Sequence, residues 1–175
     1  NAQVPEKIDS MPEIFRWPLH CLVSKIKEWR DIGISTFALF PQINSSKKSP
    51  TGAEFLQADS LTYKAALEIK ASVDRVALVG DLALDPYTSH GHDGVLDCNG
   101  VVDNDATVQI LAEGAVLAAK SGYDLVAPSD MMDGRVKAIR NELDRHNQQN
   151  TGILSYSAKF SSAYYGPFRD AIGSD

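Results

Sequence analysis

The chain has 175 residues, a formal net charge of −6 at pH 7 and a hydrophobic fraction of 43%. These values are typical of one soluble globular domain, or of part of a larger one, and they argue against the basic surface that nucleic-acid binding requires. The two cysteines, Cys21 and Cys98, are too few for a disulfide framework or a cysteine-based zinc site, which favours a reducing compartment. No apolar run approaches the length of a membrane span, so we expect neither nucleic acid nor a membrane as a partner.

The first 18 residues contain Pro5, Pro12 and Pro18 and show little hydrophobic periodicity. Such a segment predicts an irregular N-terminal arm, residues 1–18, that becomes ordered only by docking on other structure. Its apolar side chains favour a neighbouring subunit as the docking surface. Residues 19–175 show regular patterns and are predicted to form the remaining domain.

Apolar residues at helical spacing predict four helices, and short apolar runs predict four strands. The helices are expected over 19–31, 61–73, 106–120 and 135–146, and the strands over 36–40, 76–84, 125–127 and 153–157. Gly33 and Gly122 are placed to end the first and third helices. The polar segment 44–52 is predicted to be an exposed, mobile loop.

This alternation of strand and helix is typical of βαβ units, in which helices cover a parallel sheet. Polar, reactive residues follow each strand, whereas the turns from helix to strand are plain. That polarity favours an α/β fold of the (β/α)8 TIM barrel type, whose active site lies at the carboxyl ends of the strands. A doubly wound sheet usually carries a glycine-rich phosphate turn, which this sequence lacks. Four strand–helix pairs supply about the first half of a barrel of eight.

The second predicted strand leads into a loop, residues 81–94, with the sequence DLALDPYTSHGHDG. Asp81 and Asp85 are four residues apart, so extended backbone turns both to the same side. Two glycines allow the loop to fold back and bring Asp93 towards Asp85. A solvated turn does not need this density of carboxylates, imidazoles and hydroxyls, so the pattern favours a binding or catalytic loop.

Three motifs in a fixed order closely resemble the porphobilinogen synthase family, also called 5-aminolevulinate dehydratase. They are DLALDPYTSHGHDG over 81–94, APSDMMDGR over 127–135 and ILSYSAKFSSAYYGPFRDAIGS over 153–174. The resemblance implies a (β/α)8 barrel that condenses two molecules of 5-aminolevulinate to porphobilinogen through lysine Schiff bases, in tetrapyrrole (heme and chlorophyll) biosynthesis. It also implies a homo-oligomer, an octamer or hexamer, that assembles through the N-terminal arm.

Lys159 matches one of the two active-site lysines of the family, and Arg169 matches an arginine that holds a substrate carboxylate. Ser129, Tyr165 and Phe168 are assigned by the same resemblance to the substrate-binding pocket. An amine forms an imine only when it is unprotonated, so the pKa of Lys159 must fall from about 10 through burial or a neighbouring cation. We expect the aromatic residues around the lysine to supply that burial; they are Tyr156, Phe160, Tyr164, Tyr165 and Phe168. Without the motifs, Lys159 would be interpreted as a surface lysine and Arg169 as half of a surface ion pair.

Zinc-type family members carry three cysteines in the loop 81–94, at the positions held here by Ala83, Asp85 and Asp93. The chain is therefore similar to the Asp-rich, magnesium-associated subclass, because oxygen ligands remain where soft thiolates are lost. Asp85 and Asp93 are the candidate catalytic carboxylates and Mg²⁺ ligands, Asp81 is a weaker candidate ligand, and zinc is not expected. A monovalent cation, or hydrogen bonding alone, is an alternative role for the two aspartates. His92 either orients Asp93 or a water, or packs the loop.

The family's second lysine lies in a Lys-Pro-Gly-Met-type strand end, and no such segment occurs in the sequence. By that comparison the 175 residues alone are expected to be inactive. Alternative interpretations are a truncated, non-catalytic paralogue that assembles with complete subunits, and an aldolase or lyase that uses Lys159 alone. The subclass predicts a plastid-type organelle if the source is eukaryotic, and otherwise the cytoplasm.

Overall fold

The computed structural model describes residues 3–172 except 161 and 164, and it leaves out the side chain of Arg169. Its main sheet has four parallel strands in the order β3-β4-β5-β6, so every strand lies beside its neighbour in the sequence. The strands are β3 (Thr36–Leu39), β4 (Ala77–Leu82), β5 (Leu125–Pro128) and β6 (Gly152–Ile153). This sequential order is that of consecutive β/α units in a barrel.

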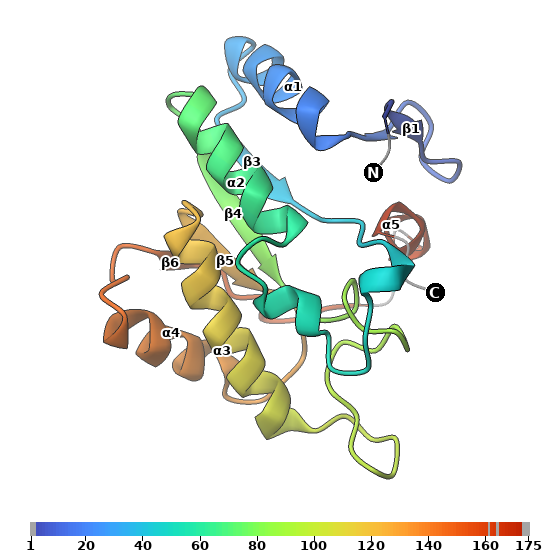
Figure 1. Ribbon diagram of the computed structural model, residues 1–175, viewed down its shortest axis with the longest axis vertical. Helices are drawn as coiled ribbons and strands as arrows, with labels where there is room; N and C mark the ends of the chain where they lie inside the picture. The colour runs from blue at the N-terminus through green and yellow to red at the C-terminus, as the bar shows by residue number, and fades with distance from the viewer. Residues whose placement is uncertain (1–2, 161, 164, 173–175) are drawn as a thin grey trace.

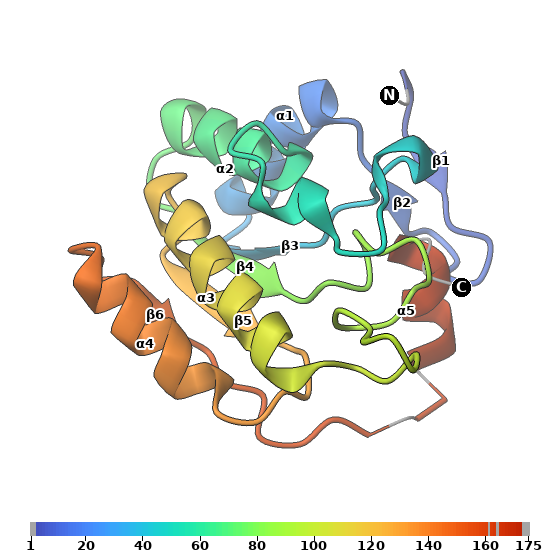
Figure 2. The same ribbon diagram turned by 60° about the horizontal axis from the view of Figure 1, so that its bottom comes forward.

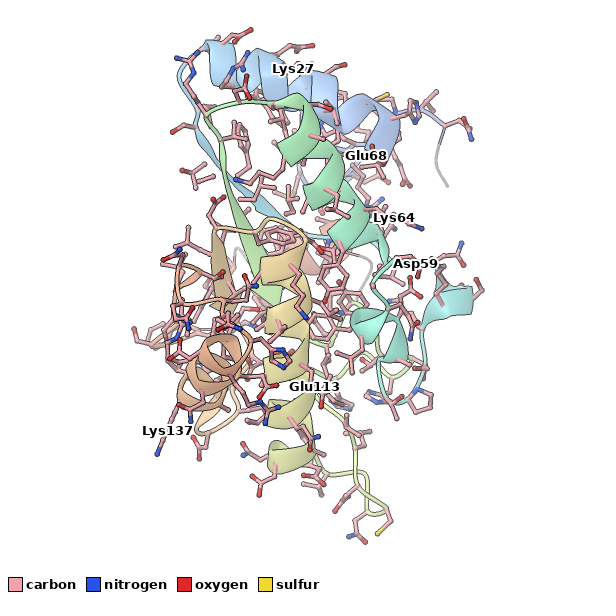
Figure 3. All side chains as sticks on the ribbon, turned by 60° about the vertical axis from the view of Figure 1, so that its left-hand side comes forward. Lys27, Asp59, Lys64, Glu68, Glu113 and Lys137 are labelled. Atoms are coloured by element: carbon pink, nitrogen blue, oxygen red, sulfur yellow. The ribbon has the colours of Figure 1, made fainter. Side chains whose placement is uncertain are left out.

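Helices α2, α3 and α4 connect the strands, and together with α1 they cover one face of the sheet (Figure 1). The helices are α1 (Leu19–Asp31), α2 (Leu61–Ser72), α3 (Asn104–Lys120), α4 (Arg135–Arg145) and α5 (Tyr165–Ile172), with short 3-10 helices η1 (Ser45–Lys47) and η2 (Ala53–Leu56). Figure 2 shows α1 to α4 in an arc around the sheet, whereas α5 lies apart with the loops that follow the strands. Figure 3 labels exposed charged residues on the outer faces of this arc, among them Lys27, Glu68 and Lys137.

The core lies between the sheet and the arc of helices, with Leu78 and Leu82 of β4 fully buried at its centre. Each large apolar side chain buried there stabilises the fold by roughly 1.5–3 kcal/mol relative to an exposed one. Helix α3 has glycine at position 114, which allows the Phe55 ring of η2 to pack directly on the helix. A Cβ added to Gly114 would lie 2.1 Å from Cε1 of Phe55.

The helices predicted from the sequence all form, within two residues of the expected bounds, and α1 has the bounds that were predicted. Asp103 caps α3 by accepting a hydrogen bond from the backbone N–H of Ala106. Gly33 and Gly122 both have positive φ, as expected for residues that end helices. Helix α5 was not predicted.

Three predicted strands are shorter than expected, and β3 loses only its last residue. The predicted strand 76–84 becomes β4, which ends at Leu82 because the chain turns: Tyr87 and Thr88 both donate to the carbonyl of Leu84. The predicted strand 153–157 becomes β6, which ends at Ile153. β6 is an edge strand in the described residues. Beyond Ile153, Leu154 donates its backbone N–H to the carbonyl of Val126 in β5 at 2.9 Å, and residues 154–158 are exposed.

The segment 1–18 was predicted to be irregular, which is wrong for its described part. β1 (Glu6–Lys7) pairs antiparallel with β2 (Phe15–Arg16) in a small hairpin. Just after the hairpin, Trp17 meets Trp29 of α1 edge-on, with ring centres 6.3 Å apart. Arg16 donates from Nε to the carbonyl of Ala171 in α5 at 2.7 Å and also donates to the carbonyl of Asp170. The segment therefore docks on its own chain, and its contact with another subunit stays a prediction.

The polar segment 44–52 is largely exposed, as predicted, but it contains η1 and is tied to the loop after β4. Ser49 donates from its backbone N–H to the carbonyl of Tyr87 at 3.1 Å, and Ser89 donates to the carbonyl of Ser49 at 3.0 Å. These hydrogen bonds connect the segment 44–52 to the loop 81–94. Within the described residues, no helix combines the length and apolarity needed to cross a membrane.

Candidate active site

The carboxyl ends of β4, β5 and β6 lie side by side because the strands are parallel and consecutive. Asp81 belongs to β4 and is paired with Ala127 of β5, two residues before Ser129. The segment after β6 carries Lys159. Three segments that are distant in sequence thus bring Asp81, Ser129 and Lys159 together. Helix α5 lies on the same side as the loops that follow the strands (Figure 2).

The amine of Lys159 contacts groups from three segments. Its Nζ donates a hydrogen bond to the carbonyl oxygen of Ser129 at 2.9 Å. It lies 3.8 Å from Oδ2 of Asp93 and 5.6 Å from the centre of the Tyr165 ring. The lysine side chain is only 25% exposed, so it belongs to a partly shielded polar centre and not to the open surface.

The pKa of Lys159 is raised above its ordinary value, which is opposite to the direction expected from the sequence. Burial of the amine is the largest single influence and lowers the pKa, but the negative charges around the amine together outweigh it. Asp93 has the largest raising influence, followed by Tyr165, Asp85 and Asp81. The aromatic cover is also thinner than expected, because Phe160 is 81% exposed. Tyr164 lies outside the described residues.

Asp81 belongs to the same cluster, since its carboxyl interacts with Ser129, Asp85 and Lys159. Burial of its carboxyl raises its pKa to about 7; a hydrogen bond with the side chain of Ser129 acts in the opposite direction, and the charge of Asp85 adds to the rise. Its Oδ1 is shielded from solvent and has no hydrogen-bond partner among the described residues. A carboxyl group that titrates near neutrality can take up or release a proton during a reaction.

Asp93 is the carboxylate closest to Lys159. Its Oδ1 accepts a hydrogen bond from the backbone N–H of Leu84 at 3.1 Å, while Oδ2 faces the amine. Its pKa is raised to about 7, first by burial and then by the negative charge of Asp85, against the opposing charge of Lys159. The loop therefore brings Asp85 and Asp93 within electrostatic reach of each other, as the sequence predicted. The route differs, because Asp85 lies in the turn after β4 and not on an extended strand.

The aspartates do not form a recognisable metal site in this structure. Over the described part of the chain, no three His, Cys, Asp or Glu side chains are grouped so that they could hold a metal ion. Asp93 is instead engaged by Lys159 and by a backbone N–H. Ala83 is buried and provides no ligand atom. His92 is exposed, with its ring centre 5.4 Å from that of His90, which favours its loop-packing role.

Helix α5 carries the remaining predicted substrate-binding residues. Tyr165 lies at its start, over the Lys159 amine. The Phe168 ring meets Phe40, just after β3, edge-on at 5.1 Å, so the helix closes against the end of a third strand. Arg169 falls within α5, but its side chain lies outside the described residues.

Sequence reasoning missed Asp130 and Arg135, which lie directly beside the site. Asp130 is 1% exposed, and its Oδ2 lies 3.4 Å from Nε of Arg135. Both belong to the APSDMMDGR motif, in which an acidic and a basic residue five apart surround an apolar pair. That spacing is the signal in the sequence from which an ion pair at this turn could have been predicted.

Comparison with known proteins gives a consistent result. The model of the family "Delta-aminolevulinic acid dehydratase" matches residues 1–175. The chain belongs to this family. It is 43% identical over 170 residues to the chloroplastic delta-aminolevulinic acid dehydratase of Hordeum vulgare. The alignment covers 96% of this chain and 40% of the Hordeum vulgare protein. It is also 43% identical over 171 residues to the enzyme of Chlamydia pneumoniae, covering 98% of this chain and 51% of the relative.

A solved structure matches the whole chain. It is the delta-aminolevulinic acid dehydratase (porphobilinogen synthase) of Toxoplasma gondii ME49 in complex with the reaction product porphobilinogen. The TM-score is 0.97 at 43% identity, and the match covers 100% of this chain and 50% of that one. The chain thus spans about half the length of the relatives it matches. The predicted fold, half of a (β/α)8 barrel, is confirmed.

Proposed function

We propose that these residues form the first catalytic half of a porphobilinogen synthase, which condenses two molecules of 5-aminolevulinate. The observation that carries the proposal is the placement of Lys159 at the strand ends, held by Ser129 and Asp93. A relative with 43% identity and the same fold is described with bound porphobilinogen. Lys159, Asp85 and Asp93 are the proposed catalytic residues, and Ser129, Tyr165, Phe168 and Arg169 the proposed substrate-binding residues.

The proposed chemistry begins with the amine of Lys159 and the ketone of 5-aminolevulinate. The amine nitrogen adds to the ketone carbon, and the carbonyl oxygen leaves as water. The protonated amine gives up two of its three protons, the oxygen takes up two, and a protonated imine remains. Asp93 is the nearest carboxyl to the amine, and its pKa of about 7 suits a group that accepts and returns protons near neutrality. Since the pKa of Lys159 is raised, removal of its proton is the step in which Asp93 has most to contribute.

The test uses the longest natural chain that contains these 175 residues, called the natural protein below. Purified natural protein should convert 5-aminolevulinate to porphobilinogen, and Lys159→Met should abolish the conversion. The 175 residues alone should be inactive, because the resemblance places a second lysine outside them. If the natural protein folds but forms no porphobilinogen, the non-catalytic paralogue is the better interpretation.

We infer that the natural protein does not use zinc in the loop 81–94 and responds to Mg²⁺. Ala83, Asp85 and Asp93 offer no thiolate, and carboxylate oxygens favour hard cations. Because no three-ligand cluster is present in the described residues, no step of the proposed reaction is assigned to the metal.

We also propose that the protein assembles into an octamer or hexamer through residues 1–18. The apolar side chains of this segment, among them Ile14, Phe15 and Trp17, support the proposal. In the isolated 175 residues, the edges of β3 and β6, which have no partner strand among the described residues, should also favour association. Analytical ultracentrifugation of the isolated 175 residues should show association, and a compact, cooperatively melting monomer would overturn the half-barrel account. For compartment, we propose a plastid-type organelle if the source is eukaryotic, which the names of the plant relatives support, and otherwise the cytoplasm.

A further inference from the structure

The loop between β5 and α4 contains a buried ion pair that the proposed chemistry does not use. Asp130 is 1% exposed, and the side chain of Arg135 is 16% exposed. Oδ2 of Asp130 and Nε of Arg135 face each other at 3.4 Å, and neither has a hydrogen-bond partner among the described residues. Removing a carboxylate and a guanidinium from water costs free energy of desolvation, so this pair is a candidate for a specific structural role.

Both side chains close the turn around Met132. Oδ1 of Asp130 accepts a hydrogen bond from the backbone N–H of Met132 at 2.7 Å. Nη1 of Arg135 donates to the carbonyl of the same residue at 2.9 Å. The pair therefore fixes the shape of the segment that begins at Ser129.

Arg135 also reaches across to the segment after β6. Its Nη2 donates to the carbonyl of Tyr156 at 3.1 Å. Tyr156 precedes Lys159 by three residues, and Ser129 directly precedes Asp130. Two hydrogen bonds thus join the same two segments: one from Arg135 to Tyr156, and one from Lys159 to the carbonyl of Ser129.

We propose that Asp130 and Arg135 are positioning residues, which hold the segment after β6 against the β5–α4 loop so that the Lys159 amine stays at Ser129. The proposal rests on the proposed function of Lys159. Such support is needed because β6 ends at Ile153 and residues 154–158 are exposed. A displacement of about 1 Å in a reacting group can lower the rate by on the order of a hundredfold.

The role requires the planar shape of the guanidinium. It faces Asp130 with Nε while Nη1 and Nη2 donate to two different carbonyls. A lysine ammonium is a compact charge that cannot make these three contacts in one plane. Arg135→Lys therefore keeps the charge and removes the geometry.

Helix α4 offers a matched control in Arg140. Its Nη1 donates to the carbonyl of Thr151 at 2.8 Å and its Nη2 to that of Gln148 at 3.1 Å. Arg140 thus ties the same helix to the same strand segment, but at the amino end of β6, away from Lys159. Arg140→Lys should have a comparable effect on stability and none on the positioning of the amine.

The experiment compares Arg135→Lys with Arg140→Lys in the natural protein, measuring kcat, KM and the fraction of Lys159 trapped by borohydride with 5-aminolevulinate. We expect Arg135→Lys to lower kcat and trapping about tenfold or more, with a smaller change in KM, and Arg140→Lys to leave kcat within about twofold. Equal effects of the two variants would overturn the proposal. If Arg135→Lys does not fold, Asp130→Asn keeps the acceptor for Met132 and removes only the charge. It should lower trapping about threefold or more, and unchanged trapping would likewise overturn the proposal.

The two proposals can fail separately. If the unmodified natural protein traps no 5-aminolevulinate at Lys159, the proposed function fails. Positioning is then measured by the acetylation rate of Lys159 relative to the other lysines. A rate altered by Arg135→Lys but not by Arg140→Lys supports positioning, and equal rates in both variants contradict it.

Discussion

The amine of Lys159 lies 3.8 Å from Oδ2 of Asp93, which joins the segment after β6 to the loop after β4. Asp93 is the foremost of the negative charges that raise the pKa of Lys159 against the effect of burial. The pair is about one quarter exposed on each side, so its contribution to stability is about 1 kcal/mol or less. Its main consequence is for the reactivity of the amine.

We predict that Asp93→Asn lowers the pKa of Lys159, because the largest opposing charge is lost while burial remains. The pH dependence of Lys159 acetylation, followed by mass spectrometry in the natural protein, measures this shift. Asp144→Asn is the control, since Asp144 is paired with Arg140 on α4. An unchanged Lys159 profile in Asp93→Asn would show that the ion pair does not set the reactivity of the amine.

Asp81 should make stability depend on pH. Its pKa is about 7 in the folded protein against 3.8 ordinarily, so the folded state binds more protons than the unfolded state between these values. Stability from this group is therefore full below about pH 4 and is lost as the pH rises through about 7. Asp81→Asn should flatten that slope. Urea unfolding of the natural protein with a chelator present, at pH about 5 and about 7.5, measures the effect.

Asp97 provides the opposite case for comparison. Hydrogen bonds from the backbone of Val101 and Asn99 lower its pKa, so its stabilising effect is present above the ordinary value and lost as the pH falls below it. Asp97→Asn should leave the slope between pH about 5 and about 7.5 unchanged. Asp93, whose pKa is also raised to about 7, should leave a smaller slope in Asp81→Asn. A slope as steep as that of the unmodified natural protein would mean that Asp81 does not contribute to it.

Gly114 should not tolerate a side chain, although alanine usually favours a helix over glycine by about 1 kcal/mol. An alanine Cβ would lie 2.1 Å from the buried Phe55 ring, so overpacking should cost about 1–3 kcal/mol and outweigh the propensity gain. Gly166→Ala in α5 is the control, because an added Cβ there meets no neighbouring atom of the described residues within 4 Å. Thermal melts that rank Gly114→Ala at or above the unmodified natural protein would contradict the packing at this contact.

The natural protein should prefer hard metal ions such as Mg²⁺ over zinc. Activity of the natural protein should survive a zinc-selective chelator and rise with added Mg²⁺, because positions 83, 85 and 93 hold Ala, Asp and Asp. The variant Ala83→Cys/Asp85→Cys/Asp93→Cys should gain zinc affinity by restoring thiolates. Stoichiometric zinc in the purified unmodified protein, measured by mass spectrometry, would sink this prediction.

The fold was largely predictable because each helix and strand is specified by a local pattern. The spacing of apolar residues placed α1 from Leu19 to Asp31, and glycines 33 and 122 ended helices where left-handed backbone was needed. The strand ends were less predictable, since they depend on which neighbours offer hydrogen bonds. β6, for example, pairs with β5 only through Gly152 and Ile153, and residues 154–158 after it are exposed.

The proximity of the candidate residues was predictable from the sequence, and their electrostatics were not. Motifs placed Lys159, Ser129 and Asp93 together, but the direction of the lysine pKa depends on how many carboxylates surround the amine in space. The roles of Asp130 and Arg135 were hidden for a similar reason. Arg135 acts through the carbonyl of Tyr156, 21 residues away, and sequence alone does not reveal a hydrogen bond to a backbone atom.

The central claim is that Lys159 forms an imine with 5-aminolevulinate, and borohydride reduction tests it most directly. The natural protein is mixed with 5-aminolevulinate, reduced, digested and analysed by mass spectrometry for modified lysines. The account predicts the adduct on the peptide that contains Lys159, with no adduct there in Lys159→Met. An adduct found only on another lysine would contradict the claim and leave Lys159 the role of a neighbouring cation that lowers the pKa of its partner.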